Sequence, residues 1–453
     1  MSLNYLATRF TCSWPWSIAV MLCEGRIVCG CADPYAKRVL GDFRTTTLTQ
    51  IWRGPIATEL REDLNTGGAP FCGDCPLKVP LAPGHPAPVR DMNVPALPSR
   101  LYIECTAACN ISCFQACCAP ETGITRTRQA GMLEWDVFTR VVDEAGPSLV
   151  RIDFFNYGEA FLHKRAVEMC EYIKAKFPHI YLYTSTNGLA LTEEKARRLV
   201  HSGIDEVTFS IDGASQETFV RYRQRGKFDL AIATLRAMAD EKSKSGRDVP
   251  HLNWRYILFK WNDNDEEMAR ARQLASDIGV DRLCWEITDH PEDSFSRRFV
   301  LGSRDLDHIR HEIWDHNNLG NAIPGATPRA QIDVRQWLPV LPLRARPSDA
   351  LTITTRVKNL STRPFRAQAS YGRRLVRLGA QLLDQTGQML NRDHARAWLP
   401  SDIAPGSSAD VRIEIPAPET PGWYALKFDL VSEGIDWFER CGSPTTTRVL
   451  WVR

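Results

Sequence analysis

The middle of the chain alternates between short apolar runs and amphipathic segments. Between Arg100 and about Phe299, each apolar run is followed by a stretch whose apolar positions recur at helical spacing. The predicted strands are Leu101–Glu104, Leu149–Phe155, Ile180–Thr184, Glu206–Ile211, Leu252–Phe259 and Arg282–Ile287. The predicted helices are Trp135–Ala145, His163–Phe177, Thr192–His201, Phe228–Lys242 and Asp265–Ile278. This alternation predicts an α/β domain over residues 100–300 with a parallel sheet, open or curled into a partial (β/α)6 TIM-like barrel.

The pattern changes after Ala350, where short alternating strands are separated by Pro and Gly. The predicted strands are Leu351–Lys358, Ala380–Asp384, Asp410–Ile415, Trp423–Val431 and Thr446–Val452. They predict an all-β sandwich over residues 343–453. Residues 301–342 are predicted to bridge the two domains, with a helix around Leu306–Asp315.

The first hundred residues show neither pattern and are rich first in cysteine and then in proline. Residues 1–78 are predicted to form a compact cysteine-rich unit, in which Gly25–Val28 makes a turn into a strand and Leu48–Leu64 has helical spacing. Residues 79–99 are rich in proline and are therefore predicted to be a linker.

The totals narrow the class of protein. A length of 453 residues suggests two to four domains. The net charge of +2 indicates no general attraction to nucleic acid or acidic membranes. No apolar run reaches the roughly 18 residues that a membrane span needs. The apolar stretch Trp14–Cys23 lacks a basic leader and a cleavage site, so we expect no signal peptide and a cytoplasmic location.

Most of the 14 cysteines occur in groups. The N-terminal groups are Cys12, Cys23, Cys29 and Cys31, followed by Cys72 and Cys75. Disulfides seldom persist in the cytosol, so this clustering predicts metal binding. The Cys72–Cys75 pair can bind one metal centre from a single turn, and Cys12 with one of Cys29 or Cys31 could complete four ligands. Such a set fits zinc or an iron–sulfur cluster.

A second group, Cys105, Cys109, Cys113, Cys117 and Cys118, follows the first predicted strand of the α/β domain. In such domains chemistry takes place at the carboxyl ends of the strands. Polar motifs follow the later strands as well. They are Asn156–Ala160, Ser185–Gly188, Ser210–Gly213 with the nearby Tyr222-Arg223, and Asn262.

Together these motifs resemble the radical S-adenosylmethionine (SAM) superfamily over residues 100–290. Cys109-Asn110 matches the family's Cys-Asn-x-x-Cys signature, and Asn156–Ala160 is similar to its Gly-Gly-Glu-Pro. The resemblance implies a 4Fe–4S cluster held by Cys109, Cys113 and Cys117, whose open iron binds SAM. Here the spacing is CxxxCxxxC rather than CxxxCxxC, so Cys118 is the alternative third ligand. The set Cys105, Cys109 and Cys113 has the same spacing and ranks lower.

The resemblance also implies which residues bind SAM. Glu159 would accept hydrogen bonds from the methionyl ammonium, and Gly158 would allow the backbone to approach it closely. Arg223 and Ser210 would bind the carboxylate. Asn187 would orient the ribose, although Asn187-Gly188 could simply form a turn, and Ser210 could be only a strand-end hydroxyl.

The N-terminal unit resembles the SPASM or twitch auxiliary-cluster domain. The matching segments are Cys12, Gly25–Asp33, Leu40–Asp42, Leu48–Trp52 and Cys72–Cys75. In the family this unit usually follows the barrel, so here the order is permuted. The resemblance favours an auxiliary 4Fe–4S cluster over zinc. It implies the ligands Cys12, Cys31, Cys72 and Cys75, with Cys29 as the alternative to Cys31 and Cys23 as a packing residue.

The C-terminal domain is similar to sugar-binding tail domains associated with bacterial O-antigen export and glycosyltransferases. The similarity rests on segments such as Pro421–Tyr424 and Leu430–Phe438. Trp423 and Trp437 could stack on sugar rings or could belong to the core.

The leading hypothesis is therefore an oxidoreductase-like radical SAM enzyme acting on a sugar or glycan-linked substrate by dehydrogenation, epimerisation or rearrangement. Its partner would be a flavodoxin- or ferredoxin-type reductant. The alternatives are modification of a peptide or protein, and a non-catalytic, zinc-stabilised glycan-binding protein.

Cys284 could donate a hydrogen atom to a substrate radical or could be a packing thiol. The candidates for lining a substrate pocket are Arg255, Tyr256, Trp285, Glu286, Asp289 and His290.

Overall fold

The computed structural model divides the chain into two compact units. The first comprises Met1–Val280 and Ile287–Val300, and the second comprises Asp281–Glu286 and Leu301–Arg453. The structure describes residues 9–81, 86–114, 128, 131–288, 291, 293–300, 303–309, 312–314, 329–335, 342–361, 364–367, 376–432, 436–441 and 443–453. Cys117, Cys118, Asp289 and His290 lie outside these residues, so the predictions made for them are not addressed by the structure.

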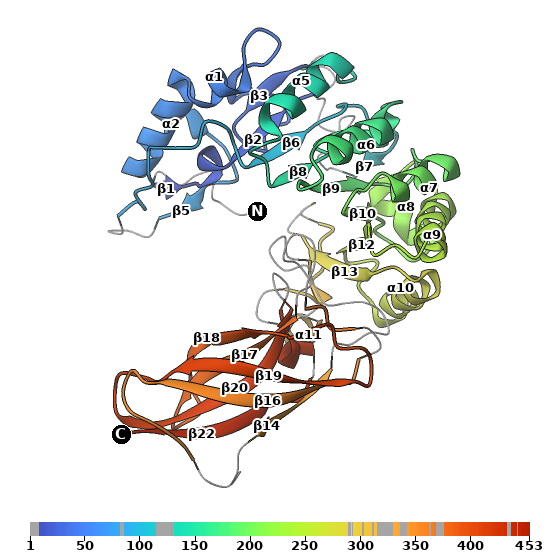
Figure 1. Cartoon of the computed structure of the whole chain (residues 1–453). Helices are drawn as coiled ribbons and strands as arrows, with labels where there is room; N and C mark the ends of the chain where they lie inside the picture. Colours follow the sequence, from blue (N-terminus) through green and yellow to red (C-terminus); the bar gives the residue numbers. More distant parts are fainter. Residues whose placement is uncertain are drawn as a thin grey trace. The chain divides into compact units, whose positions relative to one another are not determined.

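A parallel sheet organises the first unit (Figure 1). Its parallel strands are β6 (Arg100–Ile103), β8 (Arg151–Asp153), β9 (Tyr181–Thr186), β10 (Glu206–Ser210) and β12 (His251–Leu258). The intervening helices are α5 (Trp135–Ala145), α6 (Ala166–Lys176), α7 (Glu193–His201), α8 (Gln216–Tyr222), α9 (Phe228–Lys244) and α10 (Asp265–Ile278). The predicted α/β alternation is confirmed, and the sheet core contains fully buried side chains such as Phe154, Phe209 and Trp254.

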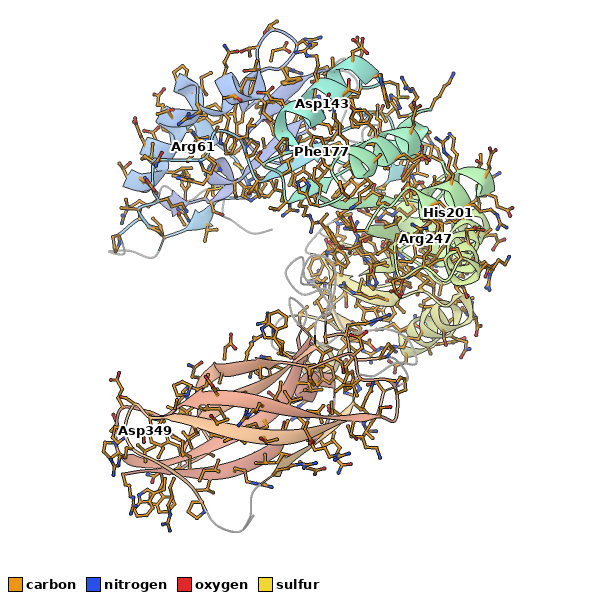
Figure 2. The ribbon with its side chains drawn as sticks, in the orientation of Figure 1. Arg61, Asp143, Phe177, His201, Arg247 and Asp349 are labelled. Atoms are coloured by element: carbon orange, nitrogen blue, oxygen red, sulfur yellow. The ribbon has the colours of Figure 1, made fainter. Side chains whose placement is uncertain are left out.

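The helices along the sheet contact one another through polar side chains at their exposed surfaces. Asp143 of α5 accepts a hydrogen bond from Tyr172 of α6 at 2.7 Å, and His201 of α7 contacts Glu241 of α9 at 2.8 Å (both Asp143 and His201 are labelled in Figure 2). Water competes for exposed polar contacts of this kind, so they contribute little to stability. The packing of the helices therefore depends mainly on their buried apolar faces.

The N-terminal segment extends this same sheet. Strands β2 (Ile18–Met21), β3 (Arg26–Val28) and β4 (Val39–Asp42) are connected in order, and β2 pairs in parallel with β6. Within the first unit the strand order is therefore β12-β10-β9-β8-β6-β2-β3-β4. The side chains of Ala19, Val20 and Met21 are fully buried, which explains why this strand lies within the sheet.

Short elements complete the N-terminal part. They are β1 (Phe10–Thr11), η2 (Trp14–Trp16), α1 (Leu48–Trp52), α2 (Pro55–Thr66), η3 (Pro70–Cys72) and β5 (Val79–Pro80). The helical spacing predicted over Leu48–Leu64 is confirmed as two helices, because Gly54 and Pro55 separate α1 from α2. Arg61 of α2, labelled in Figure 2, is buried and donates to the carbonyl oxygens of Pro15 and Trp52.

The predicted proline-rich linker is folded against the N-terminal part at two places. β5 pairs with β1 in an antiparallel bridge. Further along, the Asn65 side chain exchanges two hydrogen bonds of 2.9 Å with the backbone of Arg90. The described part of residues 79–99 therefore packs against the N-terminal part, at β1 and α2, and is not an extended spacer between domains.

The second unit contains two antiparallel-rich sheets around one core. One sheet holds β14 (Ala330–Arg335), β16 (Ala350–Asn359) and β19 (Ser408–Pro416). The other holds β15 (Leu343–Ala345), β22 (Thr446–Val452), β20 (Gly422–Ser432), β17 (Val376–Asp384), β18 (Met389–Trp398) and β21 (Asp436–Trp437). Both sheets contribute to a shared cluster that includes Val357, Ile413, Leu378 and Leu450. The unit also contains β13 (Arg282–Ile287), α11 (Arg304–Ile309) and η7 (Phe438–Cys441).

The two tryptophans proposed to stack on sugars have different environments. Trp437 is only 5% exposed, and its ring lies so close to Gly379 that a Cβ there would sit 2.4 Å from it. Trp423 is 49% exposed. Trp437 is therefore a packing residue, and only Trp423 offers an open ring face. Among the described residues, no helix has the length and apolar character required to cross a membrane.

Candidate active site

The second cysteine group begins just after β6, at the carboxyl edge of the parallel sheet. Cys113 is buried on the short strand β7 (Ser112–Cys113), which pairs with β11 (Arg223–Gln224) so that Cys113 faces Arg223. Cys109 is partly buried, and burial raises the pKa of its thiol to about 11, with smaller contributions from Glu159 and Cys113. The structure thus brings the predicted ligands Cys109 and Cys113 together.

Arg223 contacts the sulfur of Cys113. Its Nη1 lies 3.3 Å from the Cys113 Sγ, and its Nε donates to Asp212 at 2.5 Å. Burial disfavours the guanidinium charge, yet Asp212 and Cys113 raise the pKa of Arg223 overall. A buried cation beside a thiol favours the thiolate that binds iron. Arg223 therefore contacts Asp212 and Cys113, and its binding to the carboxylate of SAM stays a prediction.

Gly158 and Glu159 pack directly on the cysteine loop. A Cβ on Gly158 would lie 2.0 Å from the carbonyl oxygen of Thr106 and 2.6 Å from that of Ala108. The backbone N–H of Glu159 donates to the same Ala108 oxygen at 2.9 Å. Close approach of two backbones therefore requires glycine at position 158. The sequence predicted a close approach at this glycine, and the loop it meets is the one that carries the cysteines.

The Glu159 carboxylate is buried and accepts three hydrogen bonds. Its donors are the Thr186 hydroxyl and the Asn187 N–H, both at 2.8 Å, and the Phe161 N–H at 3.3 Å. Burial raises the pKa of Glu159, although these hydrogen bonds act in the opposite direction. Glu159 thereby links the loop after β8 to the end of β9.

Asn187 and Ser210 occupy the ends of the next two strands. The Asn187 amide donates to the side chain of Asn110 at 2.7 Å and lies 3.8 Å from the Cys109 Sγ, so it orients the cysteine loop. The Ser210 hydroxyl contacts Ser185 at 3.2 Å and accepts a hydrogen bond from Arg255 at 2.9 Å. Arg255 thus lies on the same side of the sheet as Ser210. Its neighbour Tyr256 is fully buried.

The donor set around Cys109 and Cys113 fits an iron–sulfur cluster. The Ser112 hydroxyl and the Trp261 indole N–H are buried without a hydrogen-bond partner in the described part of the chain. Trp261 packs with Cys109 and Cys113 in one apolar cluster. Buried donors of this kind are costly unless an acceptor is present, and cluster sulfurs accept hydrogen bonds. Ser112 was missed by the sequence reasoning, although it lies inside the cysteine spacing.

A charged layer crosses the sheet on the amino-terminal side of this site. Asp153 is fully buried between Arg100 and Arg151, at 2.5 Å and 2.6 Å. Further along, Glu206 accepts hydrogen bonds from Tyr181 and from Asn253. These residues were also missed, because a charged residue inside an apolar run has no distinctive sequence signal.

The first cysteine group surrounds a separate cavity. Cys12, Cys29, Cys72 and Cys75 line it, together with Arg38 and Lys78. Burial raises the pKa of the Cys72 thiol to about 12, with Cys75 and Cys12 adding to the effect and Lys78 and Arg38 opposing it. Four thiols around one small space are the donor set of zinc or an iron–sulfur cluster.

Cys31, which the sequence favoured as the fourth ligand, is not among the residues that line this cavity. Its carbonyl oxygen accepts a hydrogen bond from the Tyr157 hydroxyl. Burial raises the pKa of its thiol to about 12, with Asp153 adding to the effect and Arg100 opposing it. Cys29, the alternative that the sequence left open, lines the cavity instead, and the identity of the fourth ligand stays a prediction. The Cys-x-Asp sequence that favoured Cys31 has a local use, because Asp33 accepts hydrogen bonds from the backbone of Lys37 and Arg38.

Four further residues remain from the sequence, Cys284, Trp285, Cys105 and Cys170. Cys284 is fully buried within β13, and its role as a hydrogen donor stays a prediction. The Trp285 indole donates to Glu312. Cys105 and Cys170 are both buried in the first unit, and burial raises the pKa of each thiol.

Comparison with known families assigns both cysteine groups to a class. Residues 103–272 match the radical SAM superfamily, whose members are enzymes, and the chain therefore carries a radical SAM domain. Residues 12–76 match SPASM, an iron–sulfur cluster-binding domain. The chain thus combines an N-terminal SPASM domain with a radical SAM domain. Together these domains imply a 4Fe–4S cluster, SAM and auxiliary iron–sulfur clusters as cofactors.

Curated relatives match only part of the chain. The tungsten-containing aldehyde ferredoxin oxidoreductase cofactor-modifying protein of Pyrococcus furiosus is 24% identical over 49% of this chain and 62% of its own length. A GTP 3′,8-cyclase of Desulforamulus reducens is 32% identical over 28% of this chain and 39% of its own length. Mycofactocin maturase MftC of Mycobacterium tuberculosis is 31% identical over 31% of this chain and 34% of its own length. The chain therefore spans about a third to three-fifths of these relatives.

Among solved structures, Streptococcus suis SuiB bound to S-adenosylmethionine shares 13% identity with this chain. The match covers 47% of this chain and 45% of SuiB, with a TM-score of 0.36.

Proposed function

We propose that this protein is a radical SAM enzyme that cleaves SAM reductively and abstracts a hydrogen atom from a precursor molecule, either a peptide or a cofactor precursor. The observation that carries the proposal is the meeting of Cys109 and Cys113 with Gly158, Glu159 and Asn187 at the carboxyl ends of β6, β8 and β9. The names of two relatives, a cofactor-modifying protein and a maturase, support a precursor as substrate.

In this proposal a 4Fe–4S cluster, when bound, supplies the electron that cleaves the sulfonium of SAM. Cys109 and Cys113 hold it with Cys117 as the third ligand, or with Cys118 in its place. Arg223 stabilises the Cys113 thiolate, and Asn187 orients Cys109 through Asn110. Ser210, at the end of β10, and Arg255, its register partner within β12, carry donors suited to the carboxylate of SAM.

The auxiliary site of the proposal consists of Cys12, Cys29, Cys72 and Cys75. Arg38 and Lys78 lie at the same cavity and offset the charge that bound thiolates would carry. A second redox centre fits an enzyme that must pass an electron to or from a substrate radical. A flavodoxin- or ferredoxin-type reductant is the proposed electron donor, and the cytoplasm stays the predicted location.

A glycan-linked substrate is the second candidate, and one observation favours it. The exposed Trp423 stacks on Trp451 with an interplanar angle of 9°, and the guanidinium groups of Arg344 and Arg453 lie by the Trp451 ring. We interpret the two sheets of the second unit as a β-sandwich that could present this surface to sugar rings. The precursor reading ranks first because it is supported by the names of relatives.

Anaerobic reconstitution tests the proposal. The protein should be brown and hold about eight irons per chain, the content of two cubanes. With SAM and dithionite it should release 5′-deoxyadenosine, measured by liquid chromatography and mass spectrometry. A colourless protein that binds zinc and leaves SAM intact would instead support the non-catalytic, zinc-stabilised glycan-binding protein. Iron near four with active SAM cleavage would remove the auxiliary cluster from the proposal.

A further inference from the structure

A buried ion-pair network joins the base of the cysteine loop to the segment that contains β2, β3 and β4, residues 18–42, here called the N-terminal hairpin. At its centre is Arg128, whose side chain is completely enclosed. Its Nε and Nη2 donate to the two oxygens of Glu24 at 3.1 Å and 2.8 Å, and Nη2 also donates to Glu104. Its Nη1 donates to the carbonyl oxygen of Pro34 at 3.1 Å. The planar, multiply donating guanidinium suits such a set of partners, whereas a lysine ammonium does not.

Glu104 connects this network to both sides of the site. It follows β6, precedes Cys105 and is fully buried. Its Oε1 accepts from the backbone N–H of Cys23 at 3.2 Å as well as from Arg128. Its Oε2 accepts from the Asn156 amide at 3.1 Å and the Tyr157 N–H at 3.4 Å. One carboxylate therefore touches the end of β2 and the loop that continues into Gly158 and Glu159.

The two ends of the cysteine loop close on each other near Arg128. Thr106 and Met132 form an antiparallel bridge, and the Leu133 N–H donates to the carbonyl oxygen of Cys105 at 2.8 Å. The Thr106 hydroxyl donates to the Gly131 carbonyl oxygen at 2.9 Å. The cysteine loop, which carries Cys109 and Cys113, thus begins and ends at neighbouring positions. Arg128 links these positions to the N-terminal hairpin.

A second contact reaches the same hairpin from the loop after β8. The Tyr157 hydroxyl donates to the carbonyl oxygen of Cys31, in the segment between Cys29 and the Pro34 carbonyl that Arg128 holds. Tyr157 and Arg128, which belong to the radical SAM domain, therefore contact one short segment of the N-terminal domain at two points. Both contacts are hydrogen bonds to backbone carbonyl oxygens, so they fix the path of the chain.

The same cluster could be mistaken for a metal site. The ligand atoms of Cys23, Glu24 and Glu104 lie close enough together to bind an ion. The Arg128 guanidinium contacts all three, including the Cys23 Sγ at 3.9 Å. Arg26 also donates to Glu24, at 3.0 Å and 2.6 Å, so two guanidinium groups balance the two carboxylates. The network is therefore an ion-pair cluster whose cations belong to the protein.

We propose that Arg128 is a positioning residue through which the N-terminal domain shapes the cysteine loop, so that the two iron–sulfur sites form as one structural unit. Within the described part of the chain, its polar partners are Glu24, Glu104, Pro34 and Cys23. It acts on the candidate ligands only through the backbone. The inference rests on the proposed iron–sulfur role of the loop and adds to it a dependence of one site on the other domain.

The test compares Arg128→Met with Arg140→Met in the full-length chain. Arg140 is a matched control because it also joins the two domains, donating to the Phe43 carbonyl oxygen at 3.0 Å, but it lies on α5 away from the loop. Limited proteolysis of the iron-free protein reports on the loop without any cluster. We expect cleavage within residues 106–132 to be about tenfold faster or more in Arg128→Met, and unchanged in Arg140→Met.

Iron content gives the second reading. In a background carrying Cys72→Ala and Cys75→Ala, the iron that remains after reconstitution reports on the loop alone. Arg128→Met should lose most of this iron, Arg128→Lys should lose part of it, and Arg140→Met should retain it. Unchanged proteolysis together with unchanged iron in Arg128→Met would overturn the inference. Equal losses in Arg128→Met and Arg140→Met would overturn it too, because any contact between the domains would then suffice.

Two further outcomes are distinguishable. If Arg128→Met does not fold, Glu24→Gln takes its place, since it preserves the shape of the side chain, removes the charge and replaces one oxygen that accepts from Arg128 with an NH2 donor. Faster loop cleavage in Glu24→Gln supports the inference, and wild-type cleavage contradicts it. A wild-type chain that binds no iron would refute the proposed function, while the proteolysis comparison would still decide the role of Arg128.

Discussion

At the scale of single residues, the auxiliary site is a cavity lined by Cys12, Cys72 and Cys75 together with a fourth cysteine. The fourth member depends on the course of the chain after β3 ends at Val28. Beyond that strand no periodicity applies, so spacing could not separate Cys29 from Cys31. The contacts of Asp212 and Ser112 were likewise unpredictable, because they depend on the pairing of β7 with β11.

Two serine substitutions test the choice between Cys29 and Cys31 as the fourth ligand. Cys29→Ser should lose the auxiliary iron, about half of the total in a protein with two cubanes. Cys31→Ser should keep it, because Cys31 lies outside the cavity and contributes its carbonyl oxygen to Tyr157. The measurement is iron per chain after anaerobic reconstitution. The reverse pattern would restore Cys31 as the ligand.

At the scale of elements, strong local signals gave accurate bounds and weak ones did not. Helix α10 was predicted to its last residue, since Asn264 caps its start and Gly279 ends it in a left-handed conformation. Helix α8 and strand β11 were missed because they are short and their chain reversal depends on tertiary contacts. Strand β18 was also missed, since half of its residues are exposed and its apolar and polar positions do not alternate.

The contact between the loops after β6 and β8 can be tested with one methyl group. Gly158→Ala places a Cβ against the Thr106 carbonyl oxygen, so the cysteine loop must move, at a cost of about 1–3 kcal/mol. We expect a lower Tm and a loss of iron from the loop. Gly131→Ala is the control, because a Cβ there meets no atom within 4 Å. Equal iron in both variants would show that the loop tolerates the displacement.

At the scale of the whole molecule, the two units differ in how buried charge is used. In the first unit, buried carboxylates such as Asp153 and Glu104 have arginine partners. In the second, Asp429 of β20 is fully buried and accepts hydrogen bonds from the backbone N–H groups of Leu430 and Glu439. Burial raises the pKa of Asp429 from 3.8 to about 7, with Glu439 contributing and Lys427 opposing.

This raised pKa predicts a pH-dependent stability of the second unit. The folded state binds the Asp429 proton more tightly than the unfolded state, so its contribution is fully present below about pH 3.8 and is lost as the pH rises through about 7. Calorimetry of the full chain between pH 5 and 8 should show one transition falling in temperature. In Asp429→Asn that fall should be reduced, and an identical pH profile in the variant would refute the assignment to Asp429.

The order of strands in the first unit has a consequence for how the chain folds during synthesis. Strand β2 leaves the ribosome first, and β6, β8, β9, β10 and β12 then follow, each pairing beside the strand made just before it in that series. No later strand must be inserted between two that are already paired. The sheet can therefore grow by addition at one edge, starting from the domain that carries the auxiliary cysteines. Placing that domain before the barrel gives the nascent sheet an edge on which to form.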